Sequence, residues 1–105
     1  MPKTIPMSDI PPGEVRTVEV DNTIVAVCNV DGQFYAFDGV CPHAGGPLGD
    51  GFMNGTTVTC PWHGWQFDVK SGACTFADEI VQDRYVVNVK GDQLEITITP
   101  APATA

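Results

Sequence analysis

The sequence predicts an all-β domain, and both its composition and its frequent turn signals favour that class. Val, Ile and Thr together number 29 of the 105 residues, whereas Ala and Leu number only 10. Side chains branched at Cβ sit well on a pleated sheet and lose rotamer freedom in a helix. Gly and Pro add 20 residues that are spread along the chain without a period, which is typical of many short strands joined by turns. The length of 105 residues fits one domain, residues 1–105.

Six segments alternate or cluster in apolar residues as antiparallel strands do, and we expect strands at 14–20, 23–30, 33–38, 56–59, 84–90 and 93–99. The dipeptides Asp31-Gly32 and Asn54-Gly55 tolerate positive φ angles, so both predict tight type I′ hairpin turns. Similar breaks occur at 21–22 and 91–92. Segment 23–30 is apolar on both faces, which predicts a strand buried on both sides or placed in a barrel wall. Residues 7–13 have room for one short turn.

Two regions differ from this pattern. Residues 38–78 are rich in Gly, Cys, His and aromatic residues and interrupt the strand-like segments, so we interpret them as an insert in a β-scaffold. The tail, residues 100–105, contains little that a core would bury, and we expect it to be disordered.

Charge and hydropathy exclude several classes of partner. Five basic against 13 acidic side chains make a net charge of −8, which disfavours nucleic acid and anionic membranes because both require Lys or Arg. The longest apolar run, 24–28, is five residues, against the roughly 20 that a membrane span needs. The first 14 residues lack the apolar stretch of a signal peptide. We therefore expect a cytoplasmic protein.

The insert holds three of the chain's four cysteines and both of its histidines, and each histidine is paired with a nearby cysteine. The pairs occur as Cys41-Pro-His43 and Cys60-Pro-Trp-His63, with 16 residues between His43 and Cys60. Two sulfur and two nitrogen donors suit a tetrahedral zinc ion, although zinc sites usually group Cys with Cys and His with His. They also suit a two-iron, two-sulfide cluster in which both cysteines bind one iron and both histidines the other. The spacing favours the cluster and leaves zinc as the alternative, whereas a disulfide would explain neither histidine.

The paired pattern resembles the C-x-H … C-x-x-H signature of Rieske proteins. CPHAGGPLGDG is similar to their first cluster-binding loop, and CPWHGWQFDVKSG to their second loop with the strand and turn that follow it. The flanking DIPPGE…VEV…VCNVDGQFYAFDGV and RYVVNVKGDQLEIT resemble the β-scaffold, so the likeness covers nearly the whole chain. It implies the Rieske fold, an antiparallel β-sandwich or barrel with an inserted cluster-binding subdomain, and a [2Fe-2S] cofactor.

The resemblance also implies a role for each ligand. Cys41 and Cys60 would bind the inner iron, and His43 and His63 the outer iron. Two ferric ions, two sulfides, two thiolates and two neutral imidazoles sum to zero formal charge, so this centre accepts an electron more readily than a cluster with four thiolates. The free imidazole nitrogens can lose a proton, which couples electron uptake to proton uptake.

Departures from part of the family predict a low reduction potential. Respiratory Rieske proteins carry a further cysteine in each loop and Ser and Tyr hydroxyls after the last histidine. Here the loops have none of these cysteines, and the four residues that follow His63 carry no hydroxyl. Fewer donors to the sulfides stabilise the reduced cluster less, so we expect a midpoint of roughly −150 mV. Residues 71–82 also lack the proline-bearing loop that covers the cluster in many relatives.

Other residues receive more ordinary interpretations. We expect Cys28, in a strand, and Cys74, in a turn, to be packing thiols. Trp62 and Trp65 are expected to shield the cluster or to form a docking edge. Glycines are expected to let backbone N–H groups approach the sulfides, at positions 45, 46, 64 and 72. The acidic residues at 78, 79 and 83 are interpreted as solvated surface, with steering of a basic partner as the alternative.

The function predicted from these observations is that of a one-electron carrier and not of an enzyme. The chain has no phosphate-cradling G-x-G-x-x-G motif, and both histidines are used by the cluster, which leaves none for a 2-His-1-carboxylate iron site. The resemblance implies a ferredoxin that passes electrons from a flavin-dependent reductase to a Rieske non-haem iron oxygenase. Docking is expected to be transient, near His43 and His63, with Leu48 and Trp62 as exposed flanks.

Two other functions remain open. The chain could be a permanent small subunit of a larger redox enzyme, such as an assimilatory nitrite reductase, or a structural zinc module. The first predicts a stable complex with a large subunit, and the second predicts one zinc ion per chain without a reducible chromophore.

Overall fold

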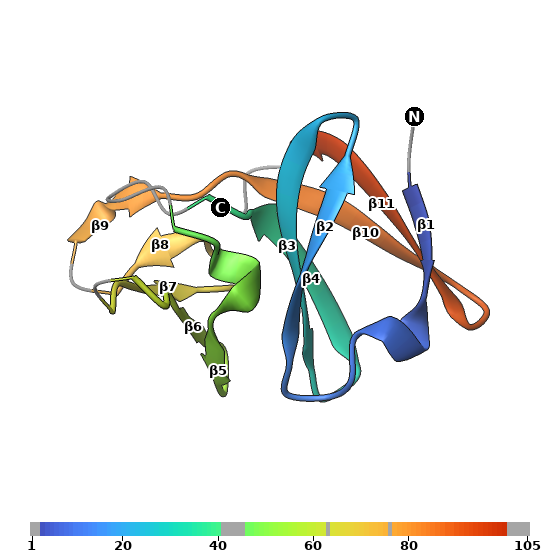
Figure 1. The fold of residues 1–105 in the computed structure, drawn as a ribbon, viewed down its shortest axis with the longest axis horizontal. Coiled ribbons are helices and arrows are strands. Elements are labelled where there is room, and N and C mark those ends of the chain that lie inside the picture. The colour runs from blue at the N-terminus through green and yellow to red at the C-terminus, as the bar shows by residue number, and fades with distance from the viewer. Residues whose placement is uncertain (1–2, 41–45, 63, 76, 101–105) are drawn as a thin grey trace.

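The computed structural model describes residues 3–40, 46–62, 64–75 and 77–100, and they form two antiparallel sheets joined side by side (Figure 1). The six-stranded sheet has the order β1-β11-β10-β4-β3-β2. Its strands are β1 (Lys3–Pro6), β2 (Val15–Val20), β3 (Thr23–Val30), β4 (Gln33–Asp38), β10 (Arg84–Lys90) and β11 (Gln93–Pro100). Because β11 also contacts β2, this sheet curls into a nearly closed barrel, called the barrel below.

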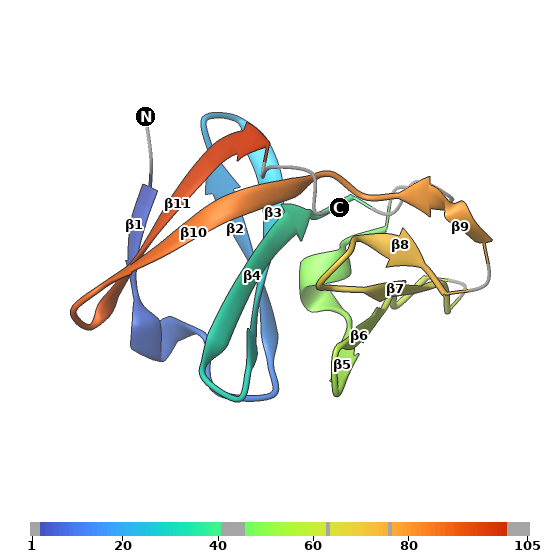
Figure 2. The same cartoon turned by 180° about the vertical axis from the view of Figure 1, so that it is seen from behind.

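The second sheet belongs to the chain between β4 and β10. Its order is β5-β6-β7-β8-β9. Its strands are β5 (Phe52–Asn54), β6 (Thr57–Thr59), β7 (Gln66–Asp68), β8 (Ala73–Cys74) and β9 (Ala77–Val81). Residues 39–81, called the inserted lobe below, leave the barrel at the end of β4 and return to it at β10 (Figure 2). The predicted insert, 38–78, corresponds to this lobe within three residues at each end.

Most predicted strands are confirmed. The bounds at 23–30, 33–38 and 84–90 agree with β3, β4 and β10, and the other three differ by a single residue at one end. Two single-turn 3-10 helices complete the fold, η1 (Met7–Asp9) and η2 (Leu48–Asp50), and the first is the short turn expected between 7 and 13. Strands β1, β5, β7, β8 and β9 lie outside the predicted segments, because each has two to five residues, too few to carry a periodic signal of its own.

One hairpin turn was predicted with the wrong geometry. Asp31 and Gly32 have φ angles of 51° and 90°, as a type I′ turn requires. Asn54, by contrast, pairs with Thr57 as the last residue of β5, so the turn positions are Gly55 and Thr56, and only Gly55 has a positive φ, 62°. A positive φ at the first turn position alone indicates type II′.

Strand β3 is buried on both faces, as its sequence predicts, because it separates two cores. Val25 and Val27 face the barrel interior, whereas Ala26 and Cys28 face the inserted lobe. The barrel core also contains Ile5, Ile10, Val20, Ala36, Leu94 and Ile96. The second core, between barrel and lobe, also contains Val15, Phe37, Leu48, Val58, Cys60, Phe67, Val69 and Cys74.

The C-terminal tail and the search for membrane-spanning helices complete the description of the fold. Pro100 is the last residue of β11, and residues 101–105 lie outside the described residues, so the disordered tail stays a prediction. In the parts of the chain that the structure describes, no helix has the length and apolarity needed to cross a membrane.

Candidate metal centre

Of the four predicted ligands, Cys60 lies within the described residues, whereas Cys41, His43 and His63 lie outside them. Cys60 directly follows β6 and is 1% exposed, packed in the core between barrel and lobe. Its sulfur accepts a hydrogen bond from the Trp62 backbone N–H at 3.4 Å. A buried sulfur that accepts an amide hydrogen bond is suited to hold a thiolate, the soft ligand that iron–sulfur clusters and zinc share.

The two ends of the first ligand loop are bonded to each other and to the barrel, and such a pair of joined loop ends is called a neck below. Val40 and Pro47 form a β-bridge that closes residues 41–46 into a loop. Just outside the bridge, the Gly39 N–H donates to the Ile24 carbonyl and the Leu48 N–H donates to the Gly39 carbonyl, both at 2.9 Å. Both ends of the loop are therefore held by backbone bonds that lead to β3.

Helix η2 presses the returning end of this loop onto the barrel, and it corrects one prediction. Leu48 is 0% exposed and packs in the core between barrel and lobe, so it is not an exposed docking flank. A β-carbon on the next residue, Gly49, would lie 2.7 Å from the Thr17 backbone, which shows how closely η2 approaches β2. The Leu48 side chain is more stable in the core than in solvent because it is apolar. It reaches the core because η2 packs against the barrel.

The second ligand loop is closed by one short hydrogen bond. The Cys60 N–H donates to the Trp65 carbonyl at 2.7 Å, so the two ends of segment 60–65 are held together. Gly64 has a φ of 74° within it, a conformation that favours glycine. Trp65 is half-buried against the core, with its ring centroid 6.5 Å from that of Phe67.

The two loops touch at Gly46. A β-carbon on Gly46 would lie 2.9 Å from the Cys60 sulfur and 2.9 Å from the Trp62 ring, so only glycine leaves this approach unobstructed. Among the described residues, which include Cys60 but not the other three predicted ligands, no three His, Cys, Asp or Glu side chains converge. The buried Cys60 sulfur and the two necks nonetheless fit a group bound between the loops.

The prediction for Gly72 is wrong in its reason. Gly72 has a φ of 80°, and a β-carbon there would lie 2.5 Å from the Gln82 carbonyl oxygen. Gly72 therefore permits close approach of two backbone segments of this chain, and its N–H donates to the Asp68 carbonyl at 2.7 Å. Gly45 lies outside the described residues.

A residue that the sequence pattern does not single out contacts the first neck. Gln82 is 5% exposed, and its Nε2 donates to the carbonyl oxygens of Asp38 and Val40 at 3.0 and 2.7 Å. A lone Gln between two strands belongs to no motif. Its role is recognised only from the packing of 81–84 against the end of β4.

The two remaining cysteines are packing thiols, as expected. Cys28 and Cys74 are buried and form no disulfide, although Cys74 lies in strand β8 and not in a turn. Its two-residue strand pairs with Phe67 of β7, a contact that no local signal predicts. Burial raises the pKa of the Cys28 thiol from 9.0 to about 12, and the backbone hydrogen bond with Tyr35 lowers it only in part. A thiol with this pKa is inert near neutral pH.

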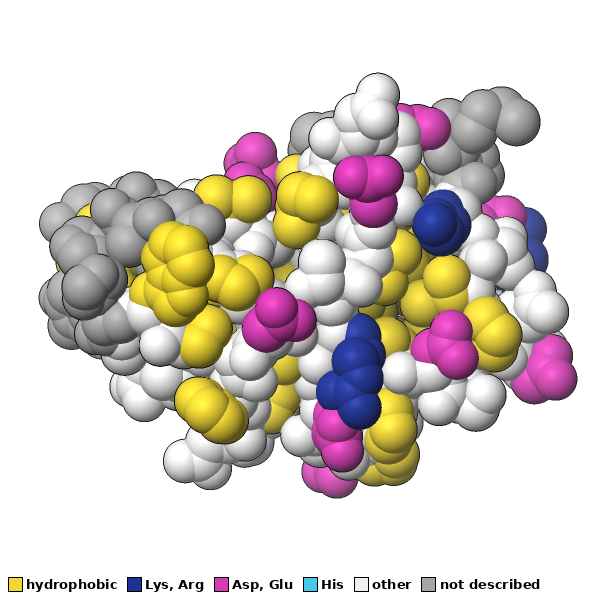
Figure 3. All heavy atoms as spheres, in the orientation of Figure 1, with side chains coloured by type: hydrophobic (Ala, Val, Ile, Leu, Met, Phe, Trp, Pro, Cys, Tyr) yellow, Lys and Arg dark blue, Asp and Glu magenta, His cyan; other side chains and the backbone are white. Residues whose placement is uncertain are grey.

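Apolar side chains gather on the surface beside the ligand loops. Val40 is 40% exposed, Trp62 50% and Val81 54%, and hydrophobic side chains border the undescribed part of the inserted lobe in Figure 3. Trp62 is thus a half-exposed aromatic side chain as well as a neighbour of Gly46. Of the three acidic residues named above, Asp83 is exposed, and the side chains at 78 and 79 lie outside the described residues.

Comparison with known proteins adds the following similarities. Residues 2–96 match the family described as Rieske [2Fe-2S] domain. The chain is 32% identical over 97 residues to the ferredoxin component of a naphthalene 1,2-dioxygenase system of Pseudomonas aeruginosa, with 90% of this chain and 92% of that relative covered. It is 39% identical to a ferredoxin component of naphthalene 1,2-dioxygenase/salicylate 5-hydroxylase systems of Ralstonia sp, but that match spans 63% of this chain and 64% of the relative.

Solved structures share the fold. The ferredoxin of carbazole 1,9a-dioxygenase from Nocardioides aromaticivorans IC177 has a TM-score of 0.85 at 27% identity, covering 92% of this chain and 97% of that one. A ferredoxin described in complex with the oxygenase of carbazole 1,9a-dioxygenase has a TM-score of 0.84 at 30% identity, covering 94% of both chains. A putative nitrite reductase small subunit has a TM-score of 0.78 at 24% identity, covering 90% and 95%, which is a likeness of fold alone.

Proposed function

The chain belongs to the Rieske [2Fe-2S] domain family, and on that basis we propose that it is a one-electron carrier that takes electrons from a flavin-dependent reductase and delivers them to a Rieske non-haem iron oxygenase. The observation that carries the proposal is the match, over nearly the full length of both chains, to ferredoxin components of dioxygenase systems. When bound, a [2Fe-2S] cluster accepts and releases a single electron. We infer no catalytic step for the chain itself.

Within this proposal, Cys41 and Cys60 bind one iron, and His43 and His63 bind the other. Cys60 supports this assignment because its sulfur is buried at the contact between the two ligand loops. The necks at Val40–Pro47 and Cys60–Trp65 support it as well, since each closes a loop that carries one Cys and one His. Protein groups that shape such loops before metal binding reduce the cost of ordering the ligands.

The partner contacts the protein at the apolar surface beside the ligand loops. Trp62, Val40 and Val81 are the large exposed apolar residues there, and an aromatic side chain at the centre of a small interface contributes strongly to binding. The docking surface proposed from the structure therefore keeps Trp62 and replaces the buried Leu48 with Val40. A small patch suits the short-lived complexes of electron transfer.

A redox titration of the purified protein, followed by absorption and by EPR of the reduced form, tests the carrier function. We expect one reducible [2Fe-2S] centre per chain with a midpoint reduction potential of roughly −150 mV. A strongly positive midpoint would contradict the oxygenase-type carrier. One zinc ion per chain without a reducible chromophore would contradict the cluster as well.

The second candidate is a permanent small subunit of a larger redox enzyme, favoured by the fold shared with a putative nitrite reductase small subunit. That function requires a lasting interface, which typically buries more apolar surface than a transient one. Size-exclusion chromatography of the protein purified from its own cells distinguishes the two. A stable complex with a large subunit would support the second candidate, and elution as a single small chain supports the carrier.

We also propose a cytoplasmic location. The buried thiols of Cys28 and Cys74 do not pair in a disulfide, which agrees with a compartment that keeps cysteines reduced.

A further inference from the structure

We propose that Gln82 is a positioning residue that holds the first ligand loop in place and thereby tunes the stability and the reduction potential of the cluster. The inference rests on the proposed ligation of the cluster by that loop. Gln82 lies between β9 and β10 and is 5% exposed. It is one of two buried polar side chains that the described residues contain, the other being Asn29.

The side-chain amide of Gln82 has as many N–H donors as there are carbonyl acceptors facing it at the neck of the first ligand loop. A Gln amide nitrogen carries two N–H donors, and here it donates to two carbonyls, that of Asp38 at 3.0 Å and that of Val40 at 2.7 Å. The Val40 carbonyl belongs to the peptide group that joins Val40 to Cys41. Because a peptide group is planar, the hydrogen bond that orients this carbonyl orients the attachment point of the proposed ligand.

The support of Gln82 is itself rigid. Its backbone N–H donates to the Gly72 carbonyl at 2.8 Å, and the Asp38 N–H donates to the carbonyl of Asp83 at 2.8 Å. The Gln82 carbonyl lies so close to Gly72 that a β-carbon there would be 2.5 Å away. The amide is therefore fixed between the β7–β8 turn and the start of β10, and it transmits that fixed position to Val40.

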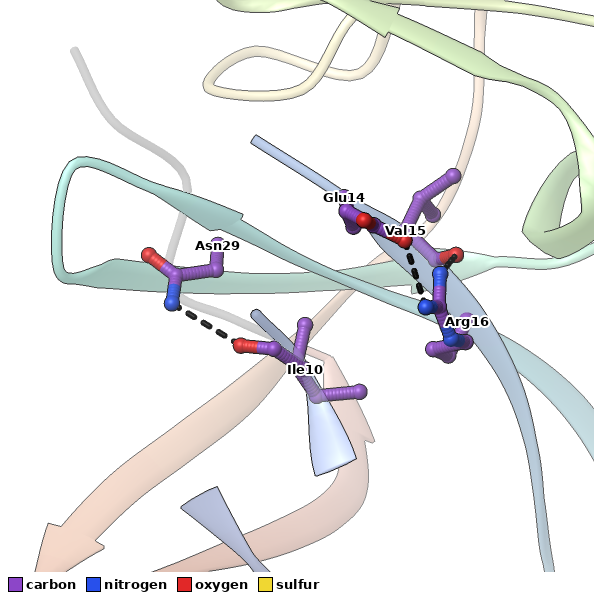
Figure 4. Close-up of polar contacts among 5 residues, drawn as sticks. All are labelled: Ile10, Glu14, Val15, Arg16 and Asn29. Carbon is purple, nitrogen blue, oxygen red and sulfur yellow. Dashed lines mark hydrogen bonds and ion pairs between the residues drawn. The ribbon is translucent and has the colours of Figure 1, made fainter. Parts of the chain in front are cut away.

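Asn29 provides an internal comparison. It is 4% exposed, its Nδ2 donates to the Ile10 carbonyl at 2.9 Å (Figure 4), and its Oδ1 accepts from the Gly32 N–H at 2.7 Å. Like Gln82, it is a buried amide that holds a loop through backbone groups. It does so near the β3–β4 turn, whereas Gln82 acts at the other end of β4, where the ligand loop begins.

The experiment compares Gln82→Met with Asn29→Leu in the full chain loaded with iron and sulfide, since each replacement keeps the approximate size and removes the amide. Both variants should unfold at a lower temperature than wild type, because each leaves backbone groups without their partners. Gln82→Met removes the donor to two carbonyls, and Asn29→Leu removes the donor to the Ile10 carbonyl and the acceptor of the Gly32 N–H. Only Gln82→Met should shift the midpoint potential and the EPR g-values. At a temperature where all three proteins are folded, it should also release iron to a chelator about tenfold faster than wild type.

Equal iron release and an unchanged midpoint in both variants would overturn the proposal, because Gln82 would then be structural only. Should Gln82→Met fail to fold, Gln82→Asn tests the same point, since its shorter side chain retains an amide that cannot reach both carbonyls. An unshifted midpoint in that variant would also overturn it. These readouts involve no partner protein, so a failure of the proposed oxygenase-linked function leaves them intact, whereas a wild-type chain without a reducible cluster would refute both proposals.

Discussion

The barrel and the inserted lobe are both antiparallel sheets, but they are stabilised differently. Five of the six barrel strands have at least six paired residues, and they enclose an aliphatic core of their own. The strands of the lobe have two to five residues. Their buried side chains, Phe67 and Val69 among them, pack with Ala26 and Cys28 on the outer face of the barrel. A sheet this short requires packing against another element to be stable, so the lobe depends on the barrel.

This difference indicates that the barrel and the inserted lobe have different roles. The barrel supplies a rigid frame whose interior contains no proposed ligand. The lobe supplies the proposed ligand loops, and among the described residues a β-bridge and backbone hydrogen bonds hold the necks of these loops. Metal binding adds folding free energy to the segment that holds the ligands. We therefore expect the stability of the lobe to depend on the cluster and that of the barrel to be nearly independent of it.

The largest expected effect is the loss of the cluster in Cys60→Ser. A serine oxygen is a poor substitute for a thiolate on iron, so iron content and visible absorption should fall to background. Cys28→Ala is the matched control, since Cys28 is equally buried in the same core. It should keep the cluster and lose about 1 kcal/mol of stability. Full iron content in Cys60→Ser would remove Cys60 from the ligand set.

Removal of the iron from the wild-type protein should destabilise the inserted lobe and leave the barrel nearly unchanged, which is the most direct test of the difference between them. After chelation under anaerobic conditions, backbone amides of the lobe, such as those of Cys60 and Val69, should exchange with deuterium much faster. Amides of the barrel strands, such as those of Val27 and Ile96, should keep their protection. Uniform loss of protection in both regions would show that barrel and lobe unfold as one unit.

A cavity in the barrel core should change stability without changing the redox centre. Leu94 is 0% exposed and packs in the barrel core, so Leu94→Ala should cost about 2–5 kcal/mol, measured by chemical denaturation. The midpoint potential of the folded variant should equal that of wild type. A shifted midpoint would show that strain passes from the barrel interior into the ligand loops.

A methyl group at the contact between the loops should have a smaller effect on stability and a local effect on the site. In Gly46→Ala the new β-carbon would lie 2.9 Å from the Cys60 sulfur, an overpacking that typically costs about 1–3 kcal/mol. We expect incomplete loading with cluster and an altered EPR spectrum. Normal loading and an unchanged spectrum would show that the loops separate at this point without cost.

The smallest predicted effect is a pH dependence that originates in Cys28. Burial raises the pKa of its thiol from 9.0 to about 12 in the folded protein. Between these values the unfolded chain loses this proton and the folded chain keeps it, so the contribution of Cys28 is complete below pH 9 and is lost as the pH rises towards 12. Denaturation of the cluster-free chain between pH 8 and 10.5 should show a steeper decline for wild type than for Cys28→Ala. Parallel curves would contradict this assignment.

Much of the barrel was predictable from local patterns. The strands around Asp31-Gly32 have the predicted bounds because the apolar segments are long and the turn residues are specific. The lobe was less predictable, since β8 forms where β7 offers a partner and β9 forms where β8 does. The misplacement of Leu48 on the surface has the same origin, because its burial depends on η2 docking against β2.

The candidate site shows the same division. The residue types and spacing of Cys41, His43, Cys60 and His63 favour an iron–sulfur centre and leave zinc as the alternative, and the resemblance to Rieske proteins points to the cluster. The position of Gln82 is not predictable in this way, since it belongs to no motif and acts through a contact with a segment distant in sequence. Gly46 does belong to the first loop motif, but its close approach to the Cys60 sulfur is a tertiary contact that the motif does not show.

The sequence by itself determined the fold class, the hairpins of the barrel and the chemistry of the proposed ligands, because strand propensity, turn conformation and metal preference are properties of residues and their near neighbours. The tertiary structure alone decided which side chains the inserted lobe buries against the barrel, how closely the two ligand loops meet, and which buried amide holds the first of them. These features depend on long-range packing, in which the free energy of a side chain is set by the surface it meets and not by the residues beside it in the chain.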